Sequence, residues 1–160
     1  MLALSALENW PRKSVDVKTT FLYGKLNEKV HMQQPEWKWS TKVLCLNRAI
    51  YRLKQVALAW WKELESSMKR LGFKCTASDA GVFFRYIGGD LIIIIVYVDD
   101  AIFFGKNIEA VQKVKKSFMA IWECQDLGTA QEFLRIKIWH AGRKILIKPP
   151  TLIRWLSILE

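Results

Sequence analysis

The chain has 160 residues, 51% of them hydrophobic and 25% charged, a composition typical of a globular domain that excludes disordered and collagen-like chains. Lysine and arginine number 25 against 15 acidic residues, so the formal net charge is +10. This excess suits a polyanionic partner but does not identify it.

The cysteine pattern indicates the redox state of the compartment, and the length of the apolar runs bears on membrane insertion. Cys45, Cys75 and Cys124 are far apart and match neither a zinc site nor a disulfide framework. They indicate a reducing, intracellular compartment, cytoplasmic or nuclear and not secreted, and we expect all three to be small buried hydrophobic residues. No run approaches the ~20 apolar residues needed to span a bilayer, so no membrane partner is expected.

The first half of the chain predicts a helix over 2–9, ended by Pro11, and a strand over 14–17. A loop punctuated by Gly24 follows. Short strands over 29–33 and 42–46 come next, separated by a turn at Pro35. The strongest predicted helix covers 53–71 and ends at Gly72. It has one apolar stripe with spacings of three and four, formed by Leu53, Val56, Ala57, Trp60, Leu64 and Met68.

The second half predicts two hairpins, a helix and a further strand pair. Strands over 82–87 and 91–98 join at Gly88-Gly89, and the chain bends again at the aspartates 99 and 100. An amphipathic helix covers 106–122. We interpret its Lys113, Lys115 and Lys116 as a solvated face, with a phosphate clamp as the alternative. Strands over 133–139 and 143–148 and a short helix over 152–159 complete the order. This order of helices and strands predicts an α+β fold in which helices cover one face of an antiparallel sheet.

Two adjacent carboxylates, Asp99 and Asp100, directly follow the apolar run 91–98. Two charges at the tip of a buried hairpin are costly unless they are compensated. A divalent cation is one compensation, because hard cations take carboxylate oxygens. A solvated Asp-Asp turn is the other interpretation, and spacing alone does not decide between them.

An ordered set of motifs carries a family resemblance. Tyr97-Val98-Asp99-Asp100 resembles the YxDD box of reverse transcriptases, and residues 16–24, DVKTTFLYG, are similar to the first catalytic box of the Ty1/copia class of retrotransposon polymerases. Segments 31–36, 51–60, 126–128 and 133–134 follow in the order that this class shows. The chain therefore resembles a Ty1/copia-type reverse transcriptase domain, partial and with degenerate motifs.

The resemblance implies a fold and a chemistry. The fold would be the palm of a right-hand polymerase, truncated, as a single partial domain over 1–160, with part of the fingers and the start of the thumb near 149–160. The activity would be RNA-directed DNA polymerisation by two-metal nucleotidyl transfer. Asp16, Asp99 and Asp100 would be catalytic and would hold two Mg²⁺ ions, with Mn²⁺ as the alternative.

The resemblance also implies partners and substrate contacts. The partners would be an RNA or DNA template-primer and deoxynucleoside triphosphates, and full function would need the fingers, thumb and ribonuclease H segments. Phe21 would lie beside the sugar of the incoming nucleotide and obstruct a ribose 2′-OH, although an ordinary core aromatic is the other interpretation. Gln55 and Tyr97 would also bind substrate, whereas Arg48 and Lys54 are either phosphate contacts or surface charges.

Several residues depart from the class pattern. Arg52, Ala57 and Leu58 stand where the class has Gly, Pro and Arg, and Arg135 replaces the Gly of a segment that grips the primer. Loss of Gly and Pro removes backbone geometry that other residues supply at a cost of about 1–3 kcal/mol each. These departures predict a fragment of reduced or no activity. The alternative is a catalytically inactive palm remnant that binds nucleic acid non-specifically through its charge.

Overall fold

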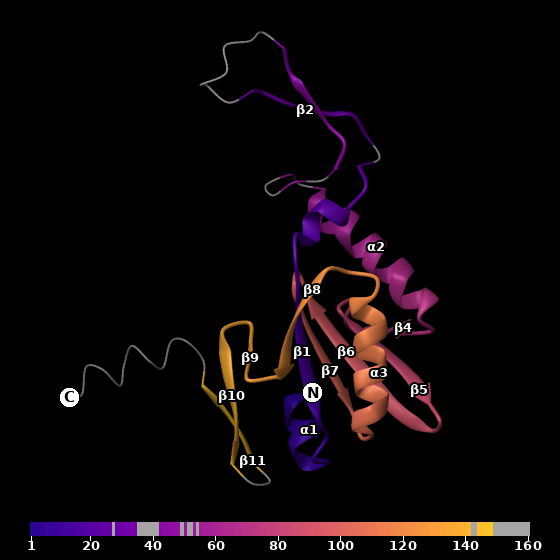
Figure 1. Ribbon diagram of the computed structural model, residues 1–160, viewed down its shortest axis with the longest axis vertical. Helices are drawn as coiled ribbons and strands as arrows, with labels where there is room; N and C mark the ends of the chain where they lie inside the picture. Colours follow the sequence, from indigo (N-terminus) through magenta and orange to yellow (C-terminus); the bar gives the residue numbers. More distant parts are fainter. Residues whose placement is uncertain are drawn as a thin grey trace, which may run out of the picture. The chain divides into compact units, whose positions relative to one another are not determined.

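The computed structural model describes residues 1–26, 28–34, 42–48, 50, 53, 55–141 and 144–148 (Figure 1). The chain divides into two compact units, one formed by Met1–Lys18 with Leu71–Glu160 and the other by Thr19–Arg70. Within the described residues, no helix is long and apolar enough to cross a membrane.

A six-stranded sheet in the order β4-β5-β6-β7-β1-β8 forms the centre of the first unit (Figure 1). All neighbouring strands are antiparallel. The strands are β1 (Arg12–Val17), β4 (Lys74–Cys75), β5 (Val82–Ile87), β6 (Asp90–Tyr97), β7 (Asp100–Gly105) and β8 (Cys124–Thr129). Both predicted hairpins are confirmed, and the first turns at Gly88 and Gly89 with φ of 59° and 87°.

The edge strand β8 was not predicted. Its register opposes Ser14 to Gly128 and Val15 to Asp126, so Leu127 is an extra residue and forms a bulge. Most of β8 is exposed, and it joins the sheet only through β1.

Helix α3 (Ile108–Met119) covers one face of this sheet. Asn107 caps its first turn, because its side-chain oxygen accepts hydrogen bonds from the backbone N–H groups of Glu109 and Ala110. The ring of Phe118 meets Phe103 of β7 edge-to-face, with ring centres 5.5 Å apart. The predicted helix is confirmed but shorter, and its buried residues include Val111, Val114 and Phe118.

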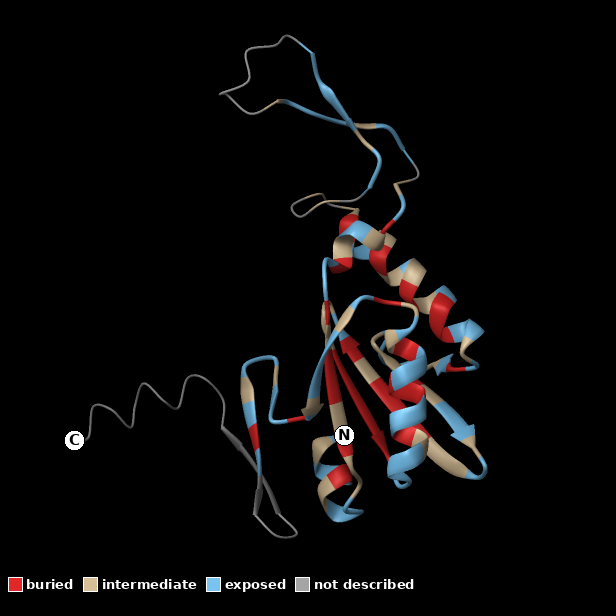
Figure 2. Ribbon diagram, viewed as in Figure 1, coloured by how far each residue is buried: buried red, intermediate tan, exposed pale blue. Residues whose placement is uncertain are grey.

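The opposite face of the sheet packs against α1 (Leu2–Leu7) and the small sheet β9 (Glu132–Phe133), β10 (Ile136–Ala141) and β11 (Lys144–Lys148). Strand residues alternate between faces, so Ile102 and Phe104 point away from Phe103. They form a buried cluster with Ile93, Ala130 and Ile138, against which Leu2, Trp10 and Phe133 pack. The prediction of helices on one face is therefore wrong for α1. Figure 2 shows the buried residues concentrated in the central strands.

The second unit contains η1 (Thr20–Tyr23), β2 (Val30–Met32), β3 (Leu44–Leu46) and α2 (Val56–Arg70). Both strands β2 and β3 were predicted, and the structure pairs them antiparallel. In α2 the predicted stripe is buried at Val56, Trp60, Leu64 and Met68, whereas Ala57 is exposed. The Trp60 ring lies 6.1 Å from that of Tyr23, centre to centre. Beyond the end of α2, Gly72 has a φ of 77°, the left-handed conformation expected there.

Some predictions fall outside the described residues, namely the turn at Pro35, residues 51, 52 and 54, and the helix over 152–159. The three cysteines are free thiols. Cys45 is exposed and Cys75 and Cys124 are half-buried, so the prediction that all three are buried is wrong.

Candidate functional site

Three predicted carboxylate residues converge at one end of the six-stranded sheet. Asp16 near the end of β1 is the register partner of Asp100 at the start of β7. Asp99 directly precedes Asp100 in the β6–β7 turn, and its carbonyl oxygen accepts a hydrogen bond of 2.8 Å from the backbone N–H of Val17. Two strands far apart in sequence, together with one turn, therefore bring Asp16, Asp99 and Asp100 together.

The turn that carries Asp99 has an unusual backbone. Val98 has a φ of 54°, in the left-handed region that β-branched residues rarely occupy. Such conformations persist only where the surrounding structure fixes them, and they cluster at functional sites. The register pairs on both sides of the turn, Tyr97 with Asp100 and Val96 with Ala101, supply that restraint.

Negative charge is unfavourable in this cluster. The pKa of Asp100 is raised above its usual value, first by burial and then by the charges of Asp99 and Asp16. Glu132 raises this pKa further, whereas a hydrogen bond from the backbone N–H of Leu134 lowers it. A cation bound here would relieve the repulsion between the carboxylates.

Burial and nearby negative charge also shift the pKa of a neighbouring cysteine. Cys124 on β8 is the register partner of Val17. Burial, Asp16 and Glu123 together raise the pKa of the Cys124 thiol to about 11. The thiol is therefore protonated at neutral pH and a poor nucleophile or metal ligand.

The other predicted site residues lie in both units. Tyr97, the register partner of Asp100, is 58% exposed beside the carboxylates. Phe21 in η1 and Gln55 before α2 belong to the second unit, where Phe21 is half-buried. The Gln55 side-chain amide donates a hydrogen bond of 2.6 Å to the carboxylate of Glu28.

The donor set has the chemistry that a hard divalent cation requires. No three His, Cys, Asp or Glu residues of the described chain are arranged so that they could hold a metal ion by themselves. Magnesium at phosphoryl-transfer sites is commonly held by one or two carboxylates together with substrate phosphates and water. Asp16, Asp99 and Asp100 match that kind of site by residue type and by their adjacency in the sheet.

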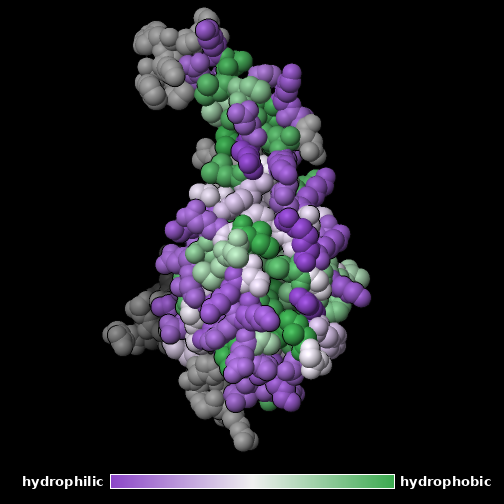
Figure 3. Space-filling model, turned by 45° about the vertical axis from the view of Figure 1, so that its right-hand side comes forward, coloured by the Kyte–Doolittle hydropathy of each residue, from purple (hydrophilic) through white to green (hydrophobic). Residues whose placement is uncertain are grey.

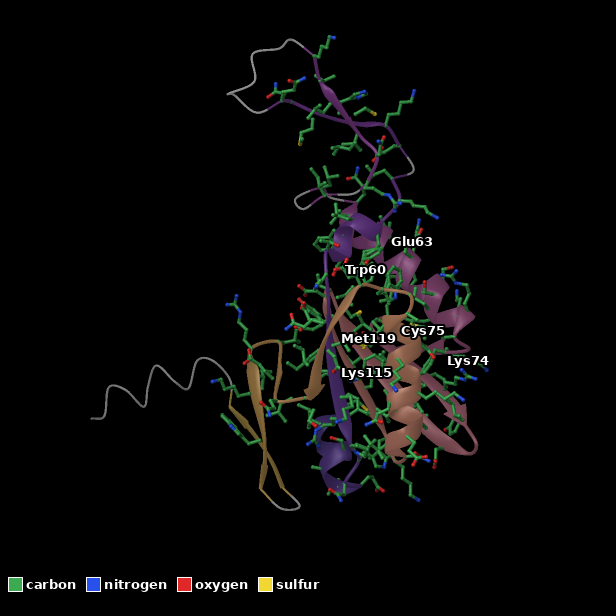
Figure 4. All side chains as sticks on the ribbon, viewed as in Figure 1. Trp60, Glu63, Lys74, Cys75, Lys115 and Met119 are labelled. Atoms are coloured by element: carbon green, nitrogen blue, oxygen red, sulfur yellow. The ribbon has the colours of Figure 1, made fainter. Side chains whose placement is uncertain are left out.

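The predicted lysine face of α3 needs one correction. Lys115, labelled on α3 in Figure 4, is buried. Its Nζ lies 2.6 Å from Asp126 Oδ1 on β8, so it forms an ion pair with a half-exposed carboxylate. Lys113 and Lys116 are exposed as predicted. Figure 3 shows hydrophilic side chains over much of the face turned forward, with hydrophobic patches between them.

Three residues near the carboxylates were not identified from the sequence, namely Cys124, Glu132 and Leu134. Cys124 and Glu132 act on the cluster through strand pairings that no local pattern contains. Leu134 contributes only its backbone N–H, which any residue type except proline would supply.

Comparison with known proteins identifies the family. A family model described as "Reverse transcriptase (RNA-dependent DNA polymerase)" matches residues 1–154. The retrovirus-related Pol polyprotein from transposon TNT 1-94 of Nicotiana tabacum is 36% identical over 143 residues, which are 86% of this chain and 11% of that protein. The corresponding polyprotein from transposon RE2 of Arabidopsis thaliana is 35% identical over 111 residues, which are 67% of this chain and 8% of that protein.

A yeast relative also matches most of the chain, at lower sequence identity. The putative transposon Ty5-1 protein of Saccharomyces cerevisiae is 28% identical over 137 residues, which are 80% of this chain and 43% of that protein. The chain thus spans about a tenth of the length of the plant relatives that it matches. It belongs to the reverse transcriptase (RNA-dependent DNA polymerase) family, and its relatives are Pol polyproteins of Ty1/copia-type retrotransposons.

Proposed function

We propose that this chain is the catalytic palm of a Ty1/copia-like RNA-directed DNA polymerase, with Asp16, Asp99 and Asp100 as its catalytic metal ligands. The observation that carries the proposal is the register of Asp16 with Asp100. Membership of the family supports the same assignment.

The proposed mechanism needs little covalent chemistry from the protein, because phosphoryl transfer depends on alignment and on neutralisation of charge. Bound Mg²⁺, or Mn²⁺, would neutralise charge on the transferred phosphate and on the attacking and leaving oxygens. Asp16 comes from a strand and Asp99 from a turn, so their carboxylates reach the site from different backbone segments. Carboxylates from a single strand could not surround two ions. Asp100 adds a third carboxylate to the same cluster.

The proposed substrate contacts come from outside the carboxylate cluster. The ring of Phe21 would pack against the sugar of a deoxynucleotide, and the exposed Tyr97 would contact the template-primer. The amide of Gln55 would position the nucleotide after leaving its hydrogen bond with Glu28, so that bond must exchange before the nucleotide binds.

Primer extension tests this proposal. The purified chain is given an RNA template, a DNA primer, deoxynucleoside triphosphates and Mg²⁺, and incorporation is measured for the wild type, Asp99→Asn and Asp90→Asn. Asp90 lies at the opposite end of β6 and is the matched control. The proposal expects incorporation that Asp99→Asn abolishes and Asp90→Asn preserves. Incorporation that survives Asp99→Asn would contradict it.

A second candidate function is an inactive palm that binds nucleic acid through charge, which the net charge of +10 and the strained Arg135 favour. Arg135 has a φ of 62°, a conformation that suits the Gly which it replaces. In that case primer extension fails and binding to an RNA–DNA hybrid falls steeply with salt, with a log–log slope of about −0.9 per phosphate neutralised, the duplex-DNA value. Replacing Asp99 and Asp100 by Asn would leave such binding unchanged or tighter. Binding that resists salt and selects the hybrid would argue against this candidate.

A further inference from the structure

The strands β2 and β3 place a histidine and a cysteine directly opposite each other. His31, the middle residue of β2, is the register partner of Cys45, the middle residue of β3. Residues that face each other across an antiparallel ladder project from the same side of it, with Cβ atoms about 4.5–5.5 Å apart. The imidazole of His31 and the thiol of Cys45 are therefore neighbours on one face of this strand pair.

Both side chains are open to solvent. Cys45 is a free thiol in an exposed position, and His31 is exposed as well. Figure 2 shows β2 and β3 mostly in the colour of exposed residues. Val43, directly before β3, is 57% exposed and adds apolar surface beside the pair. A metal ion or a second protein can therefore reach the imidazole and the thiol without any rearrangement of the strands.

An imidazole beside a thiol is a ligand pair that suits zinc. Zn²⁺ binds Cys sulfur at about 2.3 Å and His nitrogen at about 2.0–2.1 Å, and its structural sites are closed by four ligands in tetrahedral geometry. Magnesium prefers oxygen ligands, so this pair differs in chemistry from the carboxylate cluster. One copy of the chain supplies only two of the four ligands, because the described residues contain no group of three His, Cys, Asp or Glu residues that could hold a metal ion.

A second copy of the chain would supply the other two ligands. A two-fold axis brings the same surface of both copies together, so that one His–Cys pair faces the other. Packed strand layers lie about 10 Å apart, which puts an ion midway between them about 5 Å from each backbone, within reach of both side chains. Two thiolates balance the charge of Zn²⁺, so the metal centre adds nothing to the repulsion between two chains of net charge +10.

We propose that His31 and Cys45 form half of a zinc site that two copies of this chain complete, which joins the copies in a symmetric dimer. Zinc takes the thiolate and the neutral imidazole, so binding releases the proton of each thiol and becomes tighter as pH rises. The site uses none of the three aspartates and does not depend on the proposed function.

Titration of the full chain with Zn²⁺ under reducing conditions tests the proposal. Light scattering should show the molecular mass doubling, with saturation at one Zn²⁺ per two chains, and a chelator should restore the monomer. Cys45→Ser and His31→Ala should each abolish the doubling. Cys75→Ser is the matched control, because this half-buried thiol lies outside β2 and β3, and it should leave the doubling unchanged. An unchanged mass in the wild type, or a doubling that survives Cys45→Ser, would overturn the inference.

Co²⁺ in place of Zn²⁺ identifies the ligands. Tetrahedral Co²⁺ bound to thiolate absorbs in the near ultraviolet and in the visible range, and both bands should appear with the dimer and disappear in Cys45→Ser. Both variants change exposed side chains, so thermal unfolding without metal should match that of the wild type. Cys45→Ala provides a second removal of the thiol if Cys45→Ser unfolds earlier. A dimer that resists the chelator and dissociates only with reductant is a disulfide between two Cys45 residues, and would overturn the inference.

Discussion

Asp16 and Asp100 face each other across the neighbouring strands β1 and β7, although most of the chain separates them in sequence. Their approach comes from the pairing of β1 into the sheet beside the β6–β7 hairpin. It puts like charges together at one end of the sheet, where burial first and then the charges of Asp99 and Asp16 raise the pKa of Asp100. Such local costs are typical of functional sites and vanish when the charge is removed.

Asp100→Asn is therefore expected to stabilise the fold at neutral pH. Because the pKa of Asp100 is raised in the folded state, the wild type loses stability as pH rises from the unfolded-state value, near 4, through the folded value. Below about pH 4 both versions carry a neutral side chain and the difference should vanish. Urea unfolding between pH 3 and pH 8 measures this. A stabilisation that is equal at all pH values, or that Asp90→Asn reproduces, would contradict the assigned cause.

Arg135→Gly should stabilise the protein by about 0.5–1.5 kcal/mol, because Gly adopts the φ of 62° without a steric penalty. Arg135→Ala is the matched control, since it removes the same charge and keeps the side-chain penalty. Thermal unfolding of both variants separates backbone strain from charge. If Ala stabilises as much as Gly, the effect is electrostatic and backbone strain is not its source.

Arg12 is a buried cation whose replacement should also stabilise the fold. Arg12 is only 1% exposed, and its Nη1 donates to Ser5 Oγ at 3.1 Å. Its Nε and Nη2 have no hydrogen-bond partner among the described residues, and burial lowers its pKa. Arg12→Met fills similar space without a charge and should add about 1–3 kcal/mol in chemical unfolding. The control Lys113→Met, at an exposed site, should change stability little. A loss of stability in Arg12→Met would show that the buried guanidinium charge is compensated.

The Lys115–Asp126 pair should couple α3 to β8. The Lys115 side chain is 8% exposed and that of Asp126 49% exposed, so Asp126→Asn leaves a nearly buried ammonium without its carboxylate. We expect a loss of about 1–3 kcal/mol, which adding Lys115→Met should largely recover.

The same pair has a pH signature. The hydrogen bond from Lys115 lowers the pKa of Asp126, so its stabilisation is full above the unfolded-state pKa, near 4, and is lost as pH falls through the folded value. Unfolding measured from pH 2 to pH 7 should show this loss in the wild type and not in Asp126→Asn. Additive effects of the two substitutions would mean that the pair contributes nothing to stability.

The sequence predicted elements whose signal is local. The β-branched run of β6, the Gly88-Gly89 turn and the spacing of Val111, Val114 and Phe118 in α3 each specify structure within a few residues. The apolar runs on both sides of Asp99 and Asp100 likewise predicted a hairpin that bends at these residues. Asp16 came only from the family resemblance, since nothing in its strand indicates a partner.

The features that were missed arise from tertiary pairing. Strand β8 contains Asp126 and Gly128, residues that favour turns, and it is a strand because β1 offers it a free edge. Helix α1 lies on the face opposite α3 because Leu2 packs into the cluster around Ile102, which periodicity cannot reveal. The approach of Leu134 to Asp100 depends on a backbone donor, which carries no residue signature.

Metal binding is the most direct test of the central claim that Asp16, Asp99 and Asp100 form one cation site. Crystals of the chain soaked in millimolar Mn²⁺, with and without a deoxynucleoside triphosphate, would show the ion by its anomalous scattering. We predict a peak within coordination distance of the Asp16 and Asp99 carboxylates, which disappears in Asp99→Asn and persists in Asp90→Asn. Manganese bound only elsewhere on the protein, with the three carboxylates unoccupied in the presence of the triphosphate, would contradict the account.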